Sequence, residues 1–482
     1  MYLGLDLGTS GVKALLMDSA QQIVGSESAS ISVSRPYPGW SEQNPQDWIE
    51  ACETAIEKLR IHYPREFSAT KAISFSGQMH GATLIDKAGK VLRPSILWND
   101  TRSYAEAAAL DANPVFRQRS GNIVFPGFTA PKLCWVANQE PDVFAQVAKV
   151  LLPKDYLRYW LTGDFISEMS DASGTSWLDV EKRQWSEELL NESGMRVEQM
   201  PDLVEGTTAA SELRRDLTQR WGFTKPPIVG GGAGDNAASA IGMGVVGEGQ
   251  AFLSLGTSGV LFAATNGYKP KAESAVHAFC HALPNTWHQM GVTLSATDAL
   301  NWYAGIAGKQ ASILTQALPQ RPSGPSRVRF LPYLSGERTP HNDARARGAF
   351  IGLEHQSDQP ALTQAVLEGV SFAIRDNLEA LKSTGTELGS LLAVGGGTRS
   401  EFWLQTLSNV LNLPIYRPKD GDFGAAFGAA RLAQLSITSE DPSKLLTTPE
   451  IDKVFEPQHI SEYESAYDHY RRAYPALKLL SD

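Results

Sequence analysis

An acidic residue beside a glycine-rich turn is the first feature of the sequence with a chemical use. Asp6 lies shortly before the run Gly8-Thr9-Ser10-Gly11. Backbone N–H groups in such a turn form a concave site for phosphate oxygens, and we expect the glycines to supply positive φ angles. A nearby carboxylate can hold Mg²⁺, directly or through water. A tight turn capped by an aspartate would give the same pattern, so this run alone leaves both interpretations open.

The same hexapeptide, Leu-Gly-Thr-Ser-Gly-Val, occurs at 7–12 and again at 255–260. Each copy lies between two apolar, strand-like segments, which predicts two β-hairpins with a Gly-Thr-Ser-Gly turn. Ser254 stands in the second copy where Asp6 stands in the first, so only one hairpin offers a carboxylate to a metal. Chance repetition of small residues is the competing explanation. The repeat favours two related domains, 1–245 and 246–482, with the hairpins facing a shared cleft.

A second acidic residue follows a glycine run near the middle of the chain. Asp235 and Asn236 come after the strand-like Pro-Pro-Ile-Val and the glycine-rich segment 230–234. Strand ends deliver side chains into the cleft of α/β proteins, and a carboxylate there can accept a hydroxyl proton during phosphoryl transfer. A helix N-cap is the structural alternative. The segment 232–237 also fits a variant dinucleotide fingerprint, but no strand ending in an acid about 20 residues later completes it.

Polar side chains suited to a polyol follow the strand expected at 72–75. Gln78, Met79 and His80 come directly after it, and Trp98 lies in the second polar segment, 97–102. Amide, imidazole and indole groups can bind hydroxyls, and the indole adds an aromatic wall. A lone histidine is more often structural. The pair His277 and His281 around Cys280 is expected to be structural too, since no matching ligand pair follows.

Strands and helices alternate in the pattern of an α/β protein. We expect a helix at 45–59 capped by Asn44, and an insertion at about 100–220 that shapes the substrate side. The second half predicts a helix at 361–382, a strand at 391–394, a helix at 400–411, a strand at 414–416 and a helix from 423. Glycines at 395–397 and 421–424 would admit adenosine close to the backbone, or serve tight packing. A largely parallel or mixed sheet covered on both faces follows.

Composition excludes several classes of function. The 482 residues carry 43 Lys and Arg against 53 Asp and Glu, a net charge of −10, which argues against nucleic-acid or anionic-membrane partners. No GxxxxGK[ST] motif is present, which excludes a P-loop nucleotide site. The three cysteines suggest no disulfide framework. With no basic n-region and no apolar run of membrane length, we expect a cytoplasmic protein.

Taken together, these residues resemble the FGGY family of carbohydrate kinases. Segments 127–136 and 348–368 look like its two characteristic motifs, although Ala361 replaces an expected polar residue. The resemblance runs from Asp6 to about Leu432. It implies the two-domain actin-like ATPase fold, related to ribonuclease H, with ATP and Mg²⁺ as cofactors and a small sugar as substrate. A homodimer is compatible with it.

Within the family, segments 77–81, 154–158 and 335–341 resemble members that phosphorylate D-xylulose. The resemblance implies that Asp235 is the general base and that Asp6 and Asp235 lie at the metal. It implies these sugar-binding residues: Gln78, Met79, His80, Trp98 and Asn236. It implies these nucleotide-binding residues: Gly8, Thr9, Ser10, Gly256, Thr257, Gly396, Gly397, Gly421 and Gly424.

Three other functions remain open from the sequence. A different ketose or polyol would keep the fold and the mechanism. A non-kinase actin-like ATPase would fit the hairpins but leave the polar cluster at 78–81 unexplained. A nicotinamide-dependent oxidoreductase would use the glycines at 232–237, and an NAD(H) titration would distinguish it.

Overall fold

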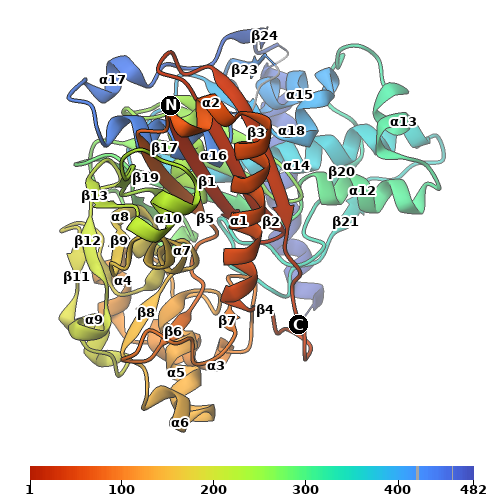
Figure 1. Cartoon of the computed structure of the whole chain (residues 1–482). Coiled ribbons are helices and arrows are strands. Elements are labelled where there is room, and N and C mark those ends of the chain that lie inside the picture. The colour runs from red at the N-terminus through yellow and green to blue at the C-terminus, as the bar shows by residue number, and fades with distance from the viewer. Residues whose placement is uncertain (420–422, 459, 482) are drawn as a thin grey trace.

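The computed structural model describes residues 1–419, 423–458 and 460–481. Figure 1 shows the red strands of the first sheet in front, strands β17 (Gly259–Thr265) and β19 (Trp287–Thr293) of the second sheet overlapping them from behind, and a smaller lobe below. Within the described residues each large sheet has seven strands. This architecture confirms the predicted α/β class and places one copy of the repeated hexapeptide in each sheet.

The first sheet is built around the N-terminal hairpin. β1 pairs antiparallel with β2 and parallel with β5. On its other side β5 pairs parallel with two strands, first with β14 and then, toward its C-terminal end, with β15. Along the sheet the order is β13 (Ala209–Glu212), β14 (Ile228–Gly230), β5 (Ala72–Gly77), β1 (Tyr2–Gly8), β2 (Gly11–Met17) and β3 (Ile23–Ser30), with β15 (Ala233–Gly234) beside β5. Parallel neighbours with mixed edges agree with the expected sheet type.

The second sheet repeats this plan. β16 pairs antiparallel with β17 and parallel with β22, as β1 does with β2 and β5. The strand order is β18 (His277–Cys280), β19 (Trp287–Thr293), β17 (Gly259–Thr265), β16 (Ala251–Leu255), β22 (Leu391–Val394), β23 (Ile415–Pro418) and β24 (Ile451–Phe455). The matching pairings confirm the predicted internal duplication.

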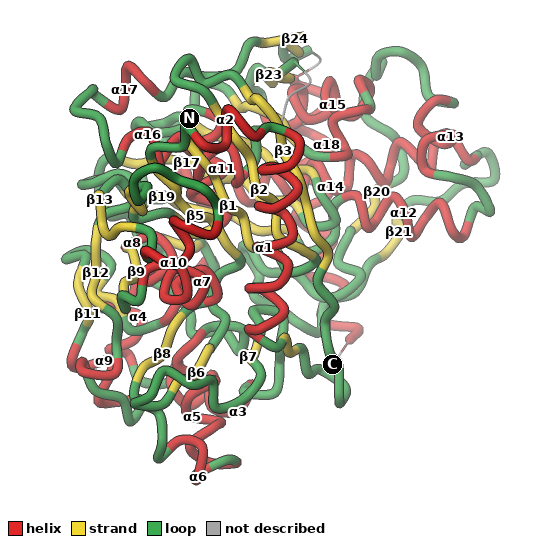
Figure 2. The backbone as a smooth tube through the Cα atoms, viewed as in Figure 1, coloured by secondary structure: helices red, strands yellow, loops and turns green. Residues whose placement is uncertain are grey.

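Alternating side chains of β1 serve both faces of the first sheet. Leu3, Leu5 and Leu7 pack under α1 (Pro45–His62), which begins after the Asn44 cap as predicted. On the other face, Tyr2 belongs to the cluster formed by α16 (Ala425–Leu435). Figure 2 shows α1 crossing in front of the yellow strands. The first sheet is therefore covered on both faces, one of them by a helix from the C-terminal half.

The helix α16 crosses α11 (Asp235–Met243) at very close range. A Cβ on Gly428 would collide with the carbonyl oxygen of Ala238, and one on Gly242 would collide with that of Phe423. The glycine spacing predicted from 423 onward therefore serves helix packing. This crossing ties the segment that begins with Asp235 to the C-terminal half of the chain.

The remaining helices cover the second sheet or build the lobes. The long helix is α14 (Gln359–Lys382), which contacts β19 and α15 (Glu401–Leu411). In Figure 1 α12 (Thr297–Ile306) and α13 (Ala311–Gln316) project to the right. The other helices of the C-terminal half are α17 (Pro442–Leu445) and α18 (Ile460–Ser481), with 3₁₀ turns η3 (Ala272–Ser274) and η4 (Gly396–Arg399). The short ribbon there is β20 (Arg329–Leu331) and β21 (Ala349–Ile351).

Much of the region predicted as an insertion forms the lower lobe in Figure 1. Its short strands pair as β4–β7, β6–β8, β9–β12 and β10–β11. The strands are β4 (Glu42–Gln43), β6 (Thr83–Ile85), β7 (Ser95–Ile96), β8 (Lys149–Leu151), β9 (Ile166–Glu168), β10 (Leu178–Asp179), β11 (Gln184–Trp185) and β12 (Asp202–Val204). The helices of the N-terminal half besides α1 and α11 are α2 (Pro64–Ser68), α3 (Tyr104–Asp111), α4 (Pro114–Ser120), α5 (Thr129–Gln139), α6 (Pro141–Phe144), α7 (Pro153–Thr162), α8 (Met169–Ala172), η1 (Ser173–Thr175), α9 (Glu187–Glu192), η2 (Val197–Gln199) and α10 (Arg215–Arg220).

One reason given for the hairpins is wrong. Neither hairpin's glycines adopt the left-handed φ that we expected the turns to need. Gly11 is instead required by a close approach, because a Cβ there would lie 2.5 Å from the carbonyl oxygen of Ala29 on the neighbouring strand. Both hairpins do form, with Gly8 opposite Gly11 and Leu255 opposite Gly259.

In the described part of the chain, no helix is long and apolar enough to cross a membrane.

Candidate active site

Strand register brings the two predicted acids together. Asp6 on β1 lies opposite Ser76 on β5, and Ser76 lies opposite Ala233 on β15. One step further, Leu7, Gly77 and Gly234 form the next row. Beyond that row the hairpin turn, Gln78 and Asp235 leave the sheet at the same edge. The sheet therefore places a carboxylate, a phosphate-type turn and the polar cluster side by side.

Asp235 is not the N-cap of α11. Gly234 occupies the cap position and Asp235 is the first helical residue, so the N-cap interpretation is excluded. One carboxylate oxygen accepts the backbone N–H of Asn236 at 2.7 Å and its side-chain amide at 2.9 Å. Behind the strand, the buried Arg158 donates to the carbonyls of Gly230 and Gly231, which fixes the glycine run that leads to Asp235.

The two carboxylates form an electrostatically unusual pair. Burial, together with the charge of Asp6, raises the pKa of Asp235 to about 6. Burial also raises the pKa of Asp6, although the nearby Ser76 hydroxyl and the charge of Lys13 act in the other direction. A carboxyl with a pKa near 6 is mostly ionised at neutral pH and accepts a proton more readily than an ordinary aspartate. Asp235 therefore has the properties of a general base.

A hydrogen-bond network joins the first hairpin to the polar cluster. The Thr9 hydroxyl donates to Gln78 at 3.1 Å and accepts the indole N–H of Trp98 at 2.9 Å. Gln43 donates to the Thr9 carbonyl at 2.7 Å and accepts from Gln78 at 3.0 Å. Gln78 is buried, so its bonds hold the turn in place, whereas Trp98 is 48% exposed. Sugar contacts by these two side chains remain predictions.

His80 is held in a strained position by the lobe. Its φ of 68° is rare for a non-glycine residue and is typical of functional sites. Thr129 and the fully buried Lys132 both donate to its backbone carbonyl, at 3.1 and 2.8 Å. Its Nδ1 lies 2.7 Å from the Gly174 carbonyl, which can only accept, so Nδ1 carries the proton. Burial lowers the pKa of His80 to about 3, leaving Nε2 as a neutral acceptor.

The wall around His80 is aromatic and apolar. Phe128 stacks on the His80 ring with centroids 4.4 Å apart, and Phe125 meets Phe128 edge-on at 5.6 Å. Met79 is buried against Gly234, where a Cβ would approach its Sδ to 3.0 Å. The predicted residue Met79 thus packs against Gly234, directly before Asp235, whereas His80 packs against Gly174 of the lobe.

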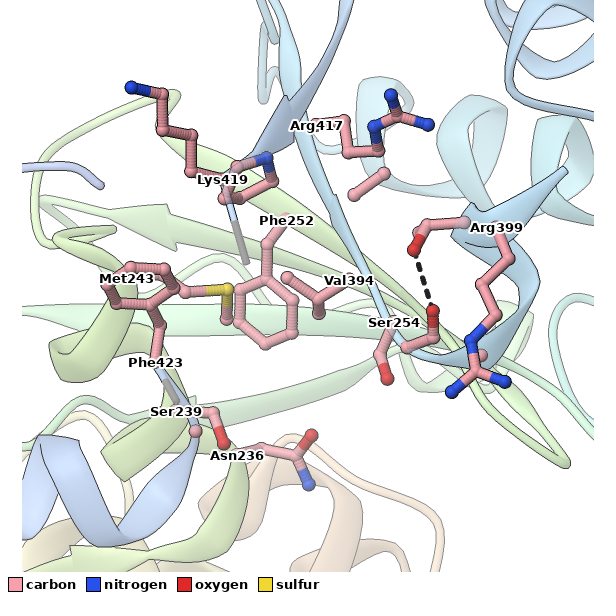
Figure 3. Close-up of a pocket in the computed structure, with 16 residues that line it drawn as sticks. Asn236, Ser239, Met243, Phe252, Ser254, Val394, Arg399, Arg417, Lys419 and Phe423 are labelled. Carbon is pink, nitrogen blue, oxygen red and sulfur yellow. Dashed lines mark hydrogen bonds between the residues drawn. The ribbon is translucent and has the colours of Figure 1, made fainter. Parts of the chain in front are cut away.

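A cavity of about 390 Å³ opens from Asn236 toward the second sheet. Figure 3 shows Asn236 and Ser239 of α11 at one end, with Met243, Phe252 and Phe423 forming an apolar wall. Gly396 lines it with open space where a Cβ would stand. The complete lining is Asn236, Ser239, Met243, Phe252, Ser254, Ala393, Val394, Gly395, Gly396, Thr398, Arg399, Arg417, Pro418, Lys419, Phe423 and Gly424. A flat apolar wall with cations at the rim suits a nucleotide.

The predicted nucleotide residues are only partly collected by this cavity. Gly396 and Gly424 line it, whereas Gly397 is buried against Leu255 and Trp403. Gly421 lies outside the described residues. Sequence reasoning missed the cavity's cations, Arg399, Arg417 and Lys419, because isolated surface charges carry no spacing signal.

The second hairpin is more open than the first. Thr257 and Ser258 are exposed, and the Gly256 carbonyl accepts from the Thr297 backbone at 2.9 Å and from its hydroxyl at 2.8 Å. Ser254, at the position of Asp6, lines the cavity. The side chains of this turn are therefore free to approach a ligand, while its backbone is fixed by α12.

The histidines around Cys280 have structural surroundings. His281 Nε2 contacts the Val245 carbonyl at 3.1 Å, and burial lowers the pKa of His281 to about 4. The Cys280 thiol is buried against the Val180 carbonyl. Across the described residues no group of three or more His, Cys, Asp or Glu side chains could hold a metal ion. His277, in contrast, reaches the aromatic wall, 5.5 Å from Phe125.

Comparisons with known proteins identify the family to which this chain is related. The sequence model of the N-terminal domain of the FGGY family of carbohydrate kinases matches residues 1–242, and that of the C-terminal domain matches residues 251–437. The xylulose kinase of Escherichia coli strain K12 is 46% identical over 482 residues, 99% of each chain. That of Klebsiella pneumoniae is 45% identical over the whole of both chains. The crystal structure of a xyloylose kinase from Brucella ovis has 62% identity, a TM-score of 0.99 and 99% coverage of each chain.

Proposed function

We propose that this chain, which belongs to the FGGY family of carbohydrate kinases, transfers the γ-phosphoryl group of ATP to the 5-hydroxyl of D-xylulose. Family membership confirms the predicted two-domain actin-like fold, which solved sugar kinases share. The observation that carries the proposal is the start of α11. Asp235 stands beside the polar cluster, and the next residue, Asn236, lines the nucleotide-type cavity.

In the proposed reaction Asp235 is the general base. Its carboxylate takes the proton of the acceptor hydroxyl while that oxygen forms a bond to the γ-phosphorus and the bond to the ADP oxygen breaks. With a pKa raised to about 6, Asp235 is ionised at neutral pH and ready to receive this proton. No covalent enzyme intermediate is needed, because phosphoryl transfer depends mostly on positioning and charge stabilisation.

The residues present fit ATP with Mg²⁺. Asp6 and Asp235 are acidic neighbours, and the charge of Asp6 raises the pKa of Asp235, a repulsion that a cation would relieve. Two carboxylates suit Mg²⁺, which usually keeps several waters and binds substrate phosphates. When bound there, Mg²⁺ would neutralise negative charge on the phosphates. Gly8, Thr9, Ser10, Gly256 and Thr257 would grip phosphates from the two hairpins. The cavity at Gly396 and Gly424 would hold the adenosine.

The choice of D-xylulose rests on the relatives and on the chemistry of the polar cluster. The curated relatives at 46% and 45% identity are xylulose kinases. His80 offers a neutral acceptor at Nε2, Asn236 offers the amide N–H that it does not donate to Asp235, and Trp98, whose indole N–H is donated to Thr9, offers an exposed aromatic face. Such groups suit the hydroxyls of an acyclic sugar. Hydrogen-bonded sites of this kind can discriminate between acceptors by about 10⁴-fold.

A substrate panel tests the proposal directly. ADP release with ATP and Mg²⁺ is measured for D-xylulose, D-ribulose, L-ribulose, L-fuculose, glycerol and gluconate. We expect kcat/KM to be highest for D-xylulose. Preference for another acceptor would overturn the sugar assignment while leaving the mechanism. ATP turnover that no sugar stimulates would overturn the kinase assignment.

We further propose a cytoplasmic homodimer. All three cysteines, Cys52, Cys134 and Cys280, are free, which suits a reducing compartment. Light scattering coupled to gel filtration would give the mass in solution, and a monomer at working concentration would overturn the dimer.

A further inference from the structure

An arginine from the C-terminal half reaches the aromatic wall around His80. Arg338 lies in the loop 332–348 between β20 and β21, and its guanidinium carbon stands 4.6 Å from the centre of the Phe125 ring. Phe125 contacts Phe128, which stacks on His80. Arg338 therefore joins a group of side chains that otherwise belong mostly to the N-terminal half.

The loop that carries Arg338 is firmly mounted on the second sheet. The Thr339 backbone N–H donates to the Val292 carbonyl at 3.1 Å, and its hydroxyl donates to the Ala275 carbonyl at 2.9 Å. Glu337 and Asp343 exchange two backbone hydrogen bonds of 2.9 Å. Because the backbone on both sides of Arg338 is fixed in this way, the fold determines the direction in which its side chain leaves the loop.

The guanidinium lacks a polar partner among the described residues. No hydrogen bond joins it to its neighbour Glu337, whose Oε1 accepts the backbone N–H groups of Leu294 and Arg338 at 3.0 and 2.8 Å and whose Oε2 has no hydrogen-bond partner. Burial lowers the pKa of Arg338, as expected for a cation removed from water. The guanidinium is only partly buried, and none of its nitrogens is among the buried side-chain atoms that lack a partner, so its five N–H donors remain available to the acceptors of a ligand.

The charge of Arg338 acts on the sugar side of the site. Besides burial, it lowers the pKa values of His80 and His277, and the His277 ring lies 5.5 Å from Phe125, the ring that Arg338 contacts. The charge that acts on Asp235 is instead that of Asp6. Arg338 thus belongs with the aromatic wall, apart from the carboxylates at which phosphoryl transfer would take place.

We propose that Arg338 is a sugar-binding residue supplied by the C-terminal half, and that its guanidinium donates hydrogen bonds to ketose oxygens at the end remote from the phosphorylated hydroxyl. This inference rests on the proposed kinase function and adds a specific contact to it. A ketose held by His80 on one side and by Arg338 on the other bridges the two halves. Sugar binding would in this way favour the arrangement in which Asp235 meets the nucleotide.

The test is a comparison of Arg338→Met, Arg338→Lys and Arg327→Met with the wild type. Methionine keeps an unbranched chain over Phe125 but removes all donors. We expect Arg338→Met to raise KM for D-xylulose by roughly 10- to 100-fold, the range for hydrogen bonds to charged groups, with KM for ATP within about threefold. Arg338→Lys should fall between, because a point charge replaces a planar fork. Arg327, with a side chain 82% exposed on the same half, is the matched control.

The possible failures are distinguishable. An unchanged KM for D-xylulose in Arg338→Met, or an equal rise for sugar and ATP, would overturn the role of Arg338 while the kinase function stands. A wild-type enzyme without xylulose-stimulated ADP release would overturn both. Thermal unfolding of each variant identifies any general loss of folding. If Arg338→Met is destabilised, the KM of Arg338→Lys for D-xylulose decides whether Arg338 binds the sugar, because that variant keeps the charge.

Discussion

The two copies of Leu-Gly-Thr-Ser-Gly-Val fold alike and are used differently. Both form the turn of an antiparallel hairpin next to a parallel strand. The first turn is bonded into the protein, with the Thr9 hydroxyl placed between Gln78 and Trp98. The second turn exposes Thr257 and is fixed through its backbone carbonyls, which accept hydrogen bonds from Thr297 and from the backbone of Ala296. The same local sequence thus forms the same hairpin turn in two different surroundings.

The neighbours of each hairpin account for the difference. Beside the first hairpin, strand register adds Asp6, Gln78 and Asp235, which are the groups an acceptor hydroxyl and a metal ion need. Beside the second, Ser254 replaces the acid and the cavity opens toward Phe252 and Arg399. The duplicated hairpins therefore differ in the residues outside the repeat that lie beside them. Three experiments can break or sharpen this contrast.

The largest effect is expected for Asp235→Asn. Removing the base should lower kcat by roughly 10²–10⁴-fold, with KM for ATP near normal, because the cavity lining is unchanged. The wild-type rate should fall about tenfold per pH unit on the acidic side of a turning point at or below pH 6, since the base must be ionised, burial raises its pKa to about 6 and bound Mg²⁺ would lower that pKa. Steady-state kinetics between pH 5 and 9 measure both.

Stability provides the control for this variant. The pKa of Asp235 is raised in the folded protein, so its ionisation destabilises the fold at neutral pH and protonation relieves that cost as pH falls. Asp235→Asn should therefore unfold at the wild-type temperature or above at pH 7.5. Retained turnover in this variant would show that Asp235 is not the general base. The first hairpin would then have no catalytic neighbour that the second one lacks, apart from Asp6.

A reciprocal exchange between the hairpins comes next in size. Asp6→Ser gives the first hairpin the residue of the second, and we expect kcat to fall by about 10²-fold from the loss of a metal-side carboxylate. Because the charge of Asp6 raises the pKa of Asp235, the acidic limb of the pH profile should also move to lower pH. Ser254→Asp should mainly raise KM for ATP, by about tenfold, since it adds a negative charge to the cavity wall.

The exchange fails as an argument if the two variants behave alike. If both variants lower kcat and raise KM for ATP to the same extent, the residue before the hairpin turn would matter equally in both copies, and the surroundings of the first hairpin would not explain the effect. Isothermal titration with a non-hydrolysable ATP analogue, with and without Mg²⁺, separates the two contributions. Asp6→Ser should weaken the Mg²⁺ dependence of binding, whereas Ser254→Asp should leave that dependence and weaken binding itself.

Local sequence was sufficient for the parts of this site that lie within a few residues of one another. Asn44 and Pro45 predicted the start of α1, and the apolar runs around both hexapeptides predicted two hairpins. Placing Asp6 beside Asp235 needed the pairing of β1 with β5 and of β5 with β15, across more than 200 residues. The sequence suggested that meeting only through the resemblance to a known family.

Other parts of the site depend on contacts that leave no local pattern. The helix α16 covers the first sheet although it follows the whole second repeat, because Gly428 permits its close crossing with α11. The strained φ of His80 depends on Lys132, 52 residues later. Arg338 stood in a recognised segment, yet its aim at Phe125 follows from a loop fixed by Val292 and Ala275. Such positions are properties of the assembled fold.

The smallest effects should come from the two threonines, and they test the comparison most directly. Thr9→Val removes a hydroxyl that bonds Gln78 and Trp98, at a cost of about 1–2 kcal/mol in the free energy of unfolding. KM for the sugar should rise several-fold with it, because Trp98 loses its partner. Thr257→Val should change unfolding by less than about 0.5 kcal/mol, as expected for an exposed position. Denaturant unfolding and steady-state kinetics with sugar and ATP measure these differences for both variants. Identical responses would mean that the hydrogen bonds of the first turn contribute no more to stability or sugar binding than the exposed second turn does.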